Sequence, residues 1–151
     1  MIDQELSVAF CPVCGGFMDS VSEEREVSIG RRSARILDEF GRCAECGESL
    51  YAPGQLDATL RRASDAIRRE EGLLSSASIR EIREKLGLTQ HEFEKLLGVG
   101  PKTVVRWEKG TVFQNRSTDS LLRVIDALPE SARFLAQLHG VTLQDRPEIV
   151  V

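Results

Sequence analysis

Residues 78–110 read SIREIREKLGLTQHEFEKLLGVGPKTVVRWEKG, and the order of apolar residues and glycines in this stretch decides the fold of the C-terminal half. Apolar residues recur every three or four positions, which is the period of an amphipathic helix. Gly87 and the segment Gly98–Gly100 divide the stretch into three helical segments. Pro101 is expected to begin the third segment, and Gly110 to end it. The stretch therefore predicts three short helices in close succession.

The second and third segments have the punctuation of a helix-turn-helix motif. Thr89 is expected to cap the second helix, with Glu92 three residues later completing a capping box. The turn contains Gly98 and an apolar Val99. In such a motif the third segment is the recognition helix that enters the major groove of DNA. The residues expected to face inward are Ile79, Ile82, Leu86, Phe93, Leu96, Leu97, Val104 and Trp107.

The recognition segment supplies the candidate DNA contacts. Side chains pointing away from the inward-facing Val104 and Trp107 are Lys102, Thr103 and Arg106. Arg106 can offer its planar fork to O6 and N7 of guanine, a pairing worth about 1–3 kcal/mol of discrimination. Lys102 can reach a base or a phosphate. Contacts to phosphate, which position the protein rather than specify a sequence, are expected from Gln90, Lys109 and Arg116.

Residues 117–138 continue as helix, with a break at Pro129 and with Ser117 or Thr118 as the expected cap. Part of this apolar surface closes the domain core. The surplus, with Phe134, Leu135 and Leu138, suits a homodimer interface that would place two recognition helices about 34 Å apart. The alternative is that all of it is core. Residues 141–151 are expected to form a loose tail, in which DRPEIVV could pair as an extra strand.

Four cysteines mark the N-terminal half: Cys11 and Cys14 in FCPVCGGF, and Cys43 and Cys46 in RCAECGES. Each pair is a CxxC followed at once by glycine, as in zinc knuckles, where the chain turns tightly so that its amides face the sulfurs. Four thiolates suit one structural Zn²⁺ per chain and leave no open position for catalysis. Iron, as in rubredoxin, and a redox dithiol are the alternatives, but the chain has few aromatic residues for the first and no βαβ setting for the second.

The segments around the cysteines complete the N-terminal half. Residues 26–37, EVSIGRRSARIL, alternate in polarity around Gly30 and predict a hairpin. Residues 55–71 predict an amphipathic helix ending before Gly72, and the serine-rich LLSSAS that follows reads as a linker in which Ser76 or Ser78 caps the next helix. We expect a zinc-binding domain with its connector helix over 1–73, and a DNA-binding and dimerisation domain over 74–140. His91 and His139 are expected to be surface residues rather than ligands.

The charge is unevenly distributed. The net charge of the whole chain is −4, yet residues 1–54 carry ten acidic side chains against five arginines, whereas residues 78–125 carry nine basic against six acidic. Only the rear half has the sign to approach phosphate. No apolar run approaches the ~18 residues needed to cross a bilayer, and the N-terminus lacks the features of a signal peptide. We therefore expect a cytoplasmic protein without a membrane partner.

The stretch LTQHEFEKLLGV…TVVRWEKG resembles the Xre/Cro-type helix-turn-helix. That resemblance implies an ion pair between Arg83 in the first helix and Glu108 after the recognition helix. With the CPVCGG and CAECGE knuckles, residues 8–128 resemble the zinc-finger/helix-turn-helix antitoxins of the MqsA (YgiT-type) family. An asparagine and an arginine read bases in that family; Arg106 matches the arginine, and Lys102 stands in place of the asparagine.

This resemblance implies a two-domain fold, with a small α+β four-cysteine zinc-binding domain followed by an all-α Xre-type helix-turn-helix domain. It also implies an antitoxin that binds a cognate toxin protein through the zinc domain. As a homodimer it would bind a palindromic double-stranded operator and repress its own operon. The alternatives are a stand-alone zinc-containing transcriptional regulator and, less favoured by the acidic front half, a zinc-ribbon RNA-binding module. No nucleophile with an adjacent base and no phosphate loop is evident, so we do not expect an enzyme.

Overall fold

The computed structural model describes residues 10–143 of the chain. It divides into two compact units, Met1–Ile67 and Arg68–Val151, so that the division falls inside the helix α1 (Gln55–Glu71). The domain boundary expected near residue 74 stays a prediction. Most of the expected C-terminal tail, including DRPEIVV, lies outside the described residues.

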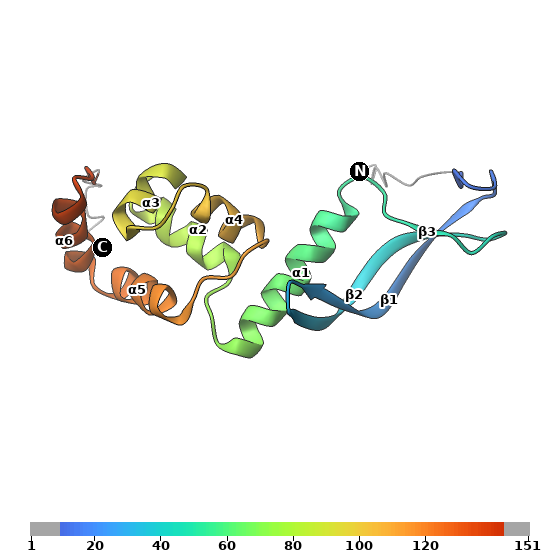
Figure 1. The fold of residues 1–151 in the computed structure, drawn as a ribbon, viewed down its shortest axis with the longest axis horizontal. Coiled ribbons are helices and arrows are strands. Elements are labelled where there is room, and N and C mark those ends of the chain that lie inside the picture. Colours follow the sequence, from blue (N-terminus) through green and yellow to red (C-terminus); the bar gives the residue numbers. More distant parts are fainter. Residues whose placement is uncertain (1–9, 144–151) are drawn as a thin grey trace, which may run out of the picture. The chain divides into compact units, whose positions relative to one another are not determined.

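The N-terminal unit is built on a long antiparallel hairpin (Figure 1). Strand β1 (Met18–Ile29) pairs along its whole length with β2 (Arg32–Cys43), and the short β3 (Ser49–Leu50) pairs with the end of β2. Gly30, at φ 62°, takes the first position of the two-residue turn, where a type II′ turn needs positive φ. The hairpin predicted over residues 26–37 is confirmed, and its strands extend well beyond that segment.

One face of β2 is buried and faces α1. Alternate residues along the strand are buried, as expected for a sheet with one covered face. The acidic Asp38 lies in this row and is 1% exposed, yet its charge is satisfied. Its carboxylate accepts hydrogen bonds from Thr59 Oγ1 of α1 at 2.7 Å and from Tyr51 Oη at 2.8 Å, and it pairs with Arg25 at 3.3 Å. Asp38 therefore fixes α1 against the hairpin. The buried residues of this row are Ala34, Ile36, Asp38 and Phe40.

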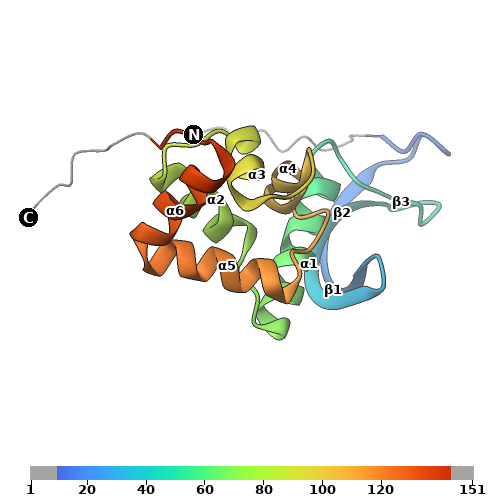
Figure 2. The same cartoon turned by 60° about the vertical axis from the view of Figure 1, so that its left-hand side comes forward.

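The C-terminal unit is a cluster of short helices (Figure 2). It contains α2 (Ser76–Lys85), α3 (Gln90–Leu97), α4 (Thr103–Lys109), α5 (Arg116–Ala127) and α6 (Pro129–His139). The break predicted at Pro129 is confirmed, since α6 begins there. The side chains that were expected to face inward all belong to or pack against one core, which also contains Leu88, Leu122, Ile125, Ala132 and Ala136.

The helix caps differ from the sequence-based expectation at three places. Ser75, not Ser76 or Ser78, caps α2, and Asn115, not Ser117 or Thr118, caps α5. Both have extended backbones, and each side chain accepts the N–H three residues on, as an N-cap requires. The third difference concerns α4, which begins at Thr103 rather than at Pro101. The cap predicted at Thr89 is confirmed, because its hydroxyl accepts the Glu92 N–H at 3.2 Å.

Asp119 on α5 is a buried carboxylate that holds the start of the helical unit. It accepts hydrogen bonds from the Leu74 N–H at 2.8 Å, from Gln114 Nε2 at 3.1 Å and from Arg123 Nε at 2.9 Å. Burial alone would raise the pKa of this carboxyl, but the bond from Leu74, together with those from Arg123 and Gln114, holds it below the usual 3.8. The folded state therefore favours the ionised form.

This arrangement predicts acid sensitivity of the C-terminal unit. Because the folded-state pKa of Asp119 is lowered, its stabilisation is complete above about pH 4 and is lost as the pH falls through that lowered value. Asp119→Asn should lower the free energy of unfolding at pH 7 by about 1–3 kcal/mol and flatten its dependence on acid. Urea unfolding followed by circular dichroism at pH 7 and pH 3 measures both. Asp126→Asn is the control: this exposed α5 carboxylate pairs only loosely with Lys85, at 3.6 Å. Equal effects of the two substitutions would contradict the prediction.

Candidate functional site

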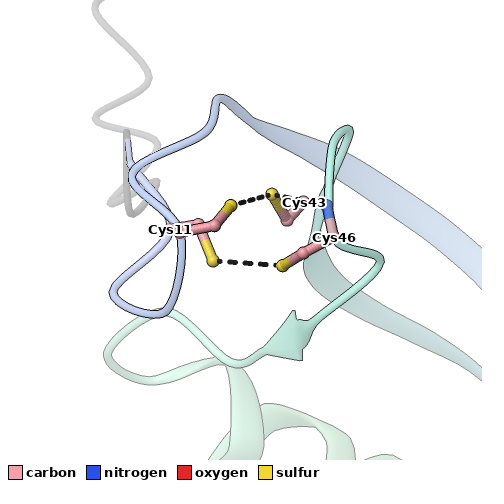
Figure 3. Close-up of side chains that lie close together, drawn as sticks. Cys11, Cys43 and Cys46 are labelled. Atoms are coloured by element: carbon pink, nitrogen blue, oxygen red, sulfur yellow. Dashed lines mark hydrogen bonds between the residues drawn. The ribbon is translucent and has the colours of Figure 1, made fainter.

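The four cysteines form one cluster at the end of the hairpin that carries β3. Their sulfur atoms all lie within 4.8 Å of one another. Cys14 Sγ is 3.3 Å from Cys43 Sγ, and Cys11 Sγ is 3.7 Å from Cys46 Sγ. Figure 3 shows the side chains from the two turns pointing toward one another. A tetrahedral zinc site with Zn–S bonds of 2.3 Å has sulfurs about 3.8 Å apart. The cluster is thus arranged to hold a metal ion.

Both cysteine turns use the same backbone pattern. In the first turn, the Gly15 N–H donates to Cys11 O and the Cys11 N–H donates to Gly16 O. In the second turn, the Gly47 N–H donates to Cys43 O and the Cys43 N–H donates to Glu48 O. Gly15 and Gly47 have φ of 76° and 80°, so the predicted role of these glycines in tight turns is confirmed. A side chain on Gly16 would come within 3.0 Å of Cys43 Sγ. Any β-carbon in place of the second glycine of CPVCGG would therefore crowd the sulfurs.

Amide donors surround the sulfurs. N–H groups of Val13, Gly16 and Cys46 lie 3.3–3.5 Å from sulfur atoms of the cluster. The bond from the Cys46 N–H is the largest of the influences that lower the pKa of Cys43 to about 6. The Gly16 N–H lowers the pKa of Cys14. The hydrogen bonds between the Cys14 thiol and Cys43 and Cys46, together with desolvation, nevertheless raise this pKa to about 12. Four crowded sulfurs thus resist ionising together, and a cation among them removes that resistance.

Helix α4 presents basic side chains to solvent and apolar side chains to the core. Val104 and Trp107 are buried, whereas Lys102, Arg106 and Lys109 are exposed and Thr103 is half-buried. Arg106 and Lys109 are three residues apart, which places them on one side of the helix, and Lys102 immediately precedes its first residue. The structure therefore brings four of the six predicted DNA-contacting residues together on α4 and the residue preceding it.

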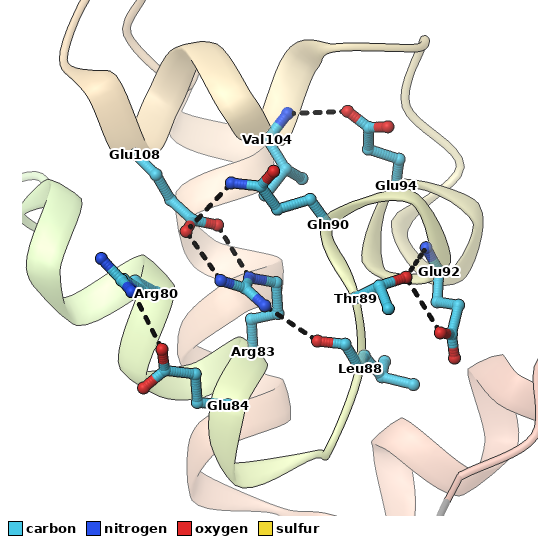
Figure 4. Close-up of polar contacts among 10 residues, drawn as sticks. All are labelled: Arg80, Arg83, Glu84, Leu88, Thr89, Gln90, Glu92, Glu94, Val104 and Glu108. Atoms are coloured by element: carbon cyan, nitrogen blue, oxygen red, sulfur yellow. Dashed lines mark hydrogen bonds and ion pairs between the residues drawn. The ribbon is translucent and has the colours of Figure 1, made fainter.

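The start of α4 is fixed by two unusual features. Lys102 has φ 67° and ψ 1°, and is the one residue other than glycine with positive φ in the described chain. A left-handed residue cannot lie inside a right-handed helix, which is why α4 begins after it. The buried carboxylate of Glu94 on α3 accepts the Val104 N–H at 3.0 Å (Figure 4). Glu94 thus supplies the cap that the side chain of Lys102 does not make.

The ion pair between Arg83 and Glu108 joins α2 to α4. Arg83 Nε and Nη2 donate to the two oxygens of Glu108, each at 2.9 Å, and Arg83 Nη1 donates to Leu88 O at 2.9 Å (Figure 4). The hydrogen bond to Glu108 raises the pKa of Arg83. The pairing implied by the Xre/Cro resemblance is confirmed.

The comparison with known protein families agrees with this combination of metal cluster and helical unit. Residues 9–135 match the model of a family described as the antitoxin component of bacterial toxin-antitoxin systems, MqsA. The chain belongs to the MqsA antitoxin family. It is 32% identical over 124 residues to Antitoxin MqsA of Escherichia coli (strain K12), covering 80% of this chain and 94% of that relative. The MqsA antitoxin family is one of antitoxins and not a known class of enzymes.

The remaining two predicted contact residues lie off α4. Gln90, the first residue of α3, is half-buried, and its amide lies 3.4 Å from Glu108 Oε1. Arg116, the first residue of α5, is exposed and donates to Glu71 O at 3.1 Å. The match to the MqsA antitoxin family does not assign contacts to either residue. The DNA contacts of all six residues remain predictions.

Sequence reasoning missed several polar residues that shape the site. Glu94 carried no distinguishing signal, because Glu94 and Lys95 both stand between the inward-facing Phe93 and Leu96. Arg68, Gln114 and Asp38 carried none, since their partners are far away along the chain. Among residues 10–143, the four cysteines are the one group of at least three ligand side chains close enough to hold a metal, and His91 and His139 take no part in it. No described helix is long and apolar enough to span a bilayer.

Proposed function

We propose that this chain is the antitoxin of a type II toxin-antitoxin system. It neutralises a partner toxin by binding it, and it represses its own operon by sequence-specific binding to double-stranded DNA. The observation that carries the proposal is that one antitoxin family spans both the cysteine cluster and the helix α4, over residues 9–135. Its mechanism is binding rather than catalysis.

DNA binding is assigned to the C-terminal unit, with α4 as the recognition helix. The exposed Arg106 reads a guanine, Lys102 and Thr103 contact the same groove, and Lys109, Gln90 and Arg116 contact phosphates. The charge supports this assignment, because residues 78–125 carry nine basic against six acidic side chains. We assign toxin binding to the acidic zinc domain.

The ion in the cysteine cluster is proposed to be a structural zinc. Cys11, Cys14, Cys43 and Cys46 offer four sulfurs and no open position, which suits Zn²⁺ better than a catalytic metal. The ion would cross-link the two cysteine turns and have no catalytic role.

A homodimer is proposed to form through the C-terminal unit and to bind a palindromic operator. Four large apolar side chains on α5, on α6 and at the residue between them are 43–65% exposed, and a second copy would cover them. Two-fold symmetry would then match the two half-sites of the operator. The exposed residues are Val124, Leu128, Phe134 and Leu138.

Replacing Arg106 with alanine should weaken binding to a duplex of the chain's own promoter by about 1–3 kcal/mol, because a base contact is lost. Lys109→Ala should instead weaken binding to all duplexes alike. It should also reduce the slope of log affinity against log salt concentration by about 1. Fluorescence anisotropy over a salt series separates the two. Arg31→Ala, in the hairpin turn of the N-terminal unit, removes the same charge and should leave binding unchanged. Native affinity of the Arg106 variant would refute α4 as the recognition helix.

Affinity capture of the tagged chain from its native host tests the antitoxin assignment. A stoichiometric small protein encoded beside this gene, lost when the N-terminal unit, residues 1–67, is deleted, is the expected result. Recovery of promoter DNA and the chain itself alone would favour a stand-alone regulator.

A further inference from the structure

Arg68 is a charged residue in the interior of the C-terminal unit. It lies on the last turn of α1, and its side chain is completely buried. Removing a guanidinium from water is costly unless its donors find acceptors. The function proposed above does not use this residue, so its burial calls for a separate explanation.

Its hydrogen bonds converge on the end of the recognition helix. Arg68 Nη2 donates to Val112 O at 2.8 Å and lies 3.4 Å from Trp107 O, and Nη1 donates to Ser76 Oγ at 2.9 Å. The guanidinium carbon lies 4.9 Å from the centre of the Phe113 ring. One side chain thereby contacts the last turn of α4, the loop after it and the start of α2.

The carbonyl groups that Arg68 contacts lie where α4 ends. Gly110 is the C-cap of α4, and Trp107 and Val112 lie on either side of it. Trp107 O also accepts the Gly110 N–H at 3.1 Å, and the last carbonyls of a helix carry partial negative charge. A buried cation at this point stabilises the helix end and fixes the direction in which the chain leaves it.

Gln114 extends the arrangement to α5. Its side-chain oxygen accepts from Arg68 Nε at 3.2 Å, and its nitrogen donates to Leu74 O at 2.9 Å and to Asp119 Oδ1 at 3.1 Å. Gln114 is itself 1% exposed. Helix α4 is therefore held at its start by Glu94 and at its end by this buried network.

We infer that Arg68 is a positioning residue for operator binding: from the last turn of α1 it holds the C-terminal end of α4 in the orientation that reads DNA. The inference rests on the proposed function, since it requires α4 to be the recognition helix. It makes the last turn of α1 part of the DNA-reading unit. A partner that unwinds this turn would lower operator affinity without touching α4.

The test compares Arg68→Met with Arg69→Met in the full chain. Methionine keeps most of the aliphatic length and removes the charge and the donors. Arg69 is the exposed neighbour on the same turn, so the control removes the same charge from the same helix. Affinity is measured at 10 °C for a duplex of the chain's own promoter and for a scrambled duplex of equal length. The folded fraction is measured in parallel by circular dichroism.

Arg68→Met should bind the promoter duplex about tenfold more weakly while its affinity for the scrambled duplex changes by less than about threefold. Arg69→Met should retain native promoter affinity, and Arg68→Lys, which keeps the charge without the planar fork, should be intermediate. The emission of Trp107, the single tryptophan of the chain, should shift to longer wavelength in Arg68→Met as the helix end loosens.

Native promoter affinity of folded Arg68→Met, with only a lower melting temperature, would show a purely structural role and overturn the inference. If Arg68→Met does not fold at 10 °C, Arg68→Lys decides, and native affinity of that variant overturns it equally. Failure of the unmodified chain to bind its promoter would instead refute the proposed function.

Discussion

Cys43→Ser is expected to unfold the N-terminal unit and to leave the helical unit folded. Cys43 is buried, lies 3.3 Å from Cys14 Sγ and is one of the four sulfurs within 4.8 Å of one another. Structural zinc sites contribute apparent binding energies of about 10–16 kcal/mol, more than a small unit with one long hairpin can replace. Metal content by mass spectrometry and two-dimensional amide NMR spectra measure the loss of the bound metal and of structure.

Trp107 allows the folding of the C-terminal unit to be followed separately from that of the N-terminal unit. The single tryptophan is buried in the C-terminal unit, so its emission should be unchanged while amide signals of residues 10–50 collapse. Ser22→Ala, an exposed substitution on β1, should keep both metal and spectrum. A chelator should reproduce the Cys43→Ser spectrum in the unmodified chain, and added zinc should reverse it. A dispersed spectrum from metal-free protein would show that the hairpin and α1 are stable alone.

Glu108→Ala should destabilise the C-terminal unit by about 3–5 kcal/mol, because it leaves Arg83 buried without its carboxylate. Side-chain exposure is 13% for Arg83 and 7% for Glu108. Thermal unfolding by circular dichroism should show a fall in Tm of more than about 10 °C for a unit of this size.

Glu84→Ala is the matched control for this substitution. Glu84 also pairs with an arginine at 2.9 Å, but Arg80 and Glu84 are 65% and 55% exposed. Such a pair within one helix is worth about 0.3–0.5 kcal/mol. If the two glutamate variants lose similar stability, the difference in burial does not govern the strength of these ion pairs.

Features set by local spacing were predictable from the sequence. The CxxC pairs, the alternation around Gly30 and the helical period of residues 78–110 each depend on neighbours within a few residues. They led to the metal cluster, the hairpin and the helix-turn-helix. Caps were less certain because several adjacent residues have the right side chain, and Ser75 and Asn115 were distinguished from their neighbours only by backbone geometry.

Features set by distant contacts were not predictable. Arg68 looked like one more charge on an amphipathic connector, yet its partner Gln114 lies 46 residues away. Asp38 likewise gave no sign of its burial, because its donors Thr59 and Tyr51 lie 21 and 13 residues away along the chain. Pairings of this kind depend on how the elements pack, which a single sequence does not display.

If α4 is the recognition helix, as proposed above, the left-handed backbone of Lys102 links the choice of operator sequence to the stability of the fold. A residue with a β-carbon is disfavoured in this conformation, by about 1 kcal/mol or more, whereas glycine and asparagine adopt it readily. Any exchange at position 102 therefore alters two properties at once, the groups offered to DNA and the cost of the turn. Asparagine or glycine would make the turn easier to form, and a β-branched residue would make it harder. An engineer retargeting this protein would find Arg106 the freer position, because its backbone lies within a regular helix and only its side chain is at stake.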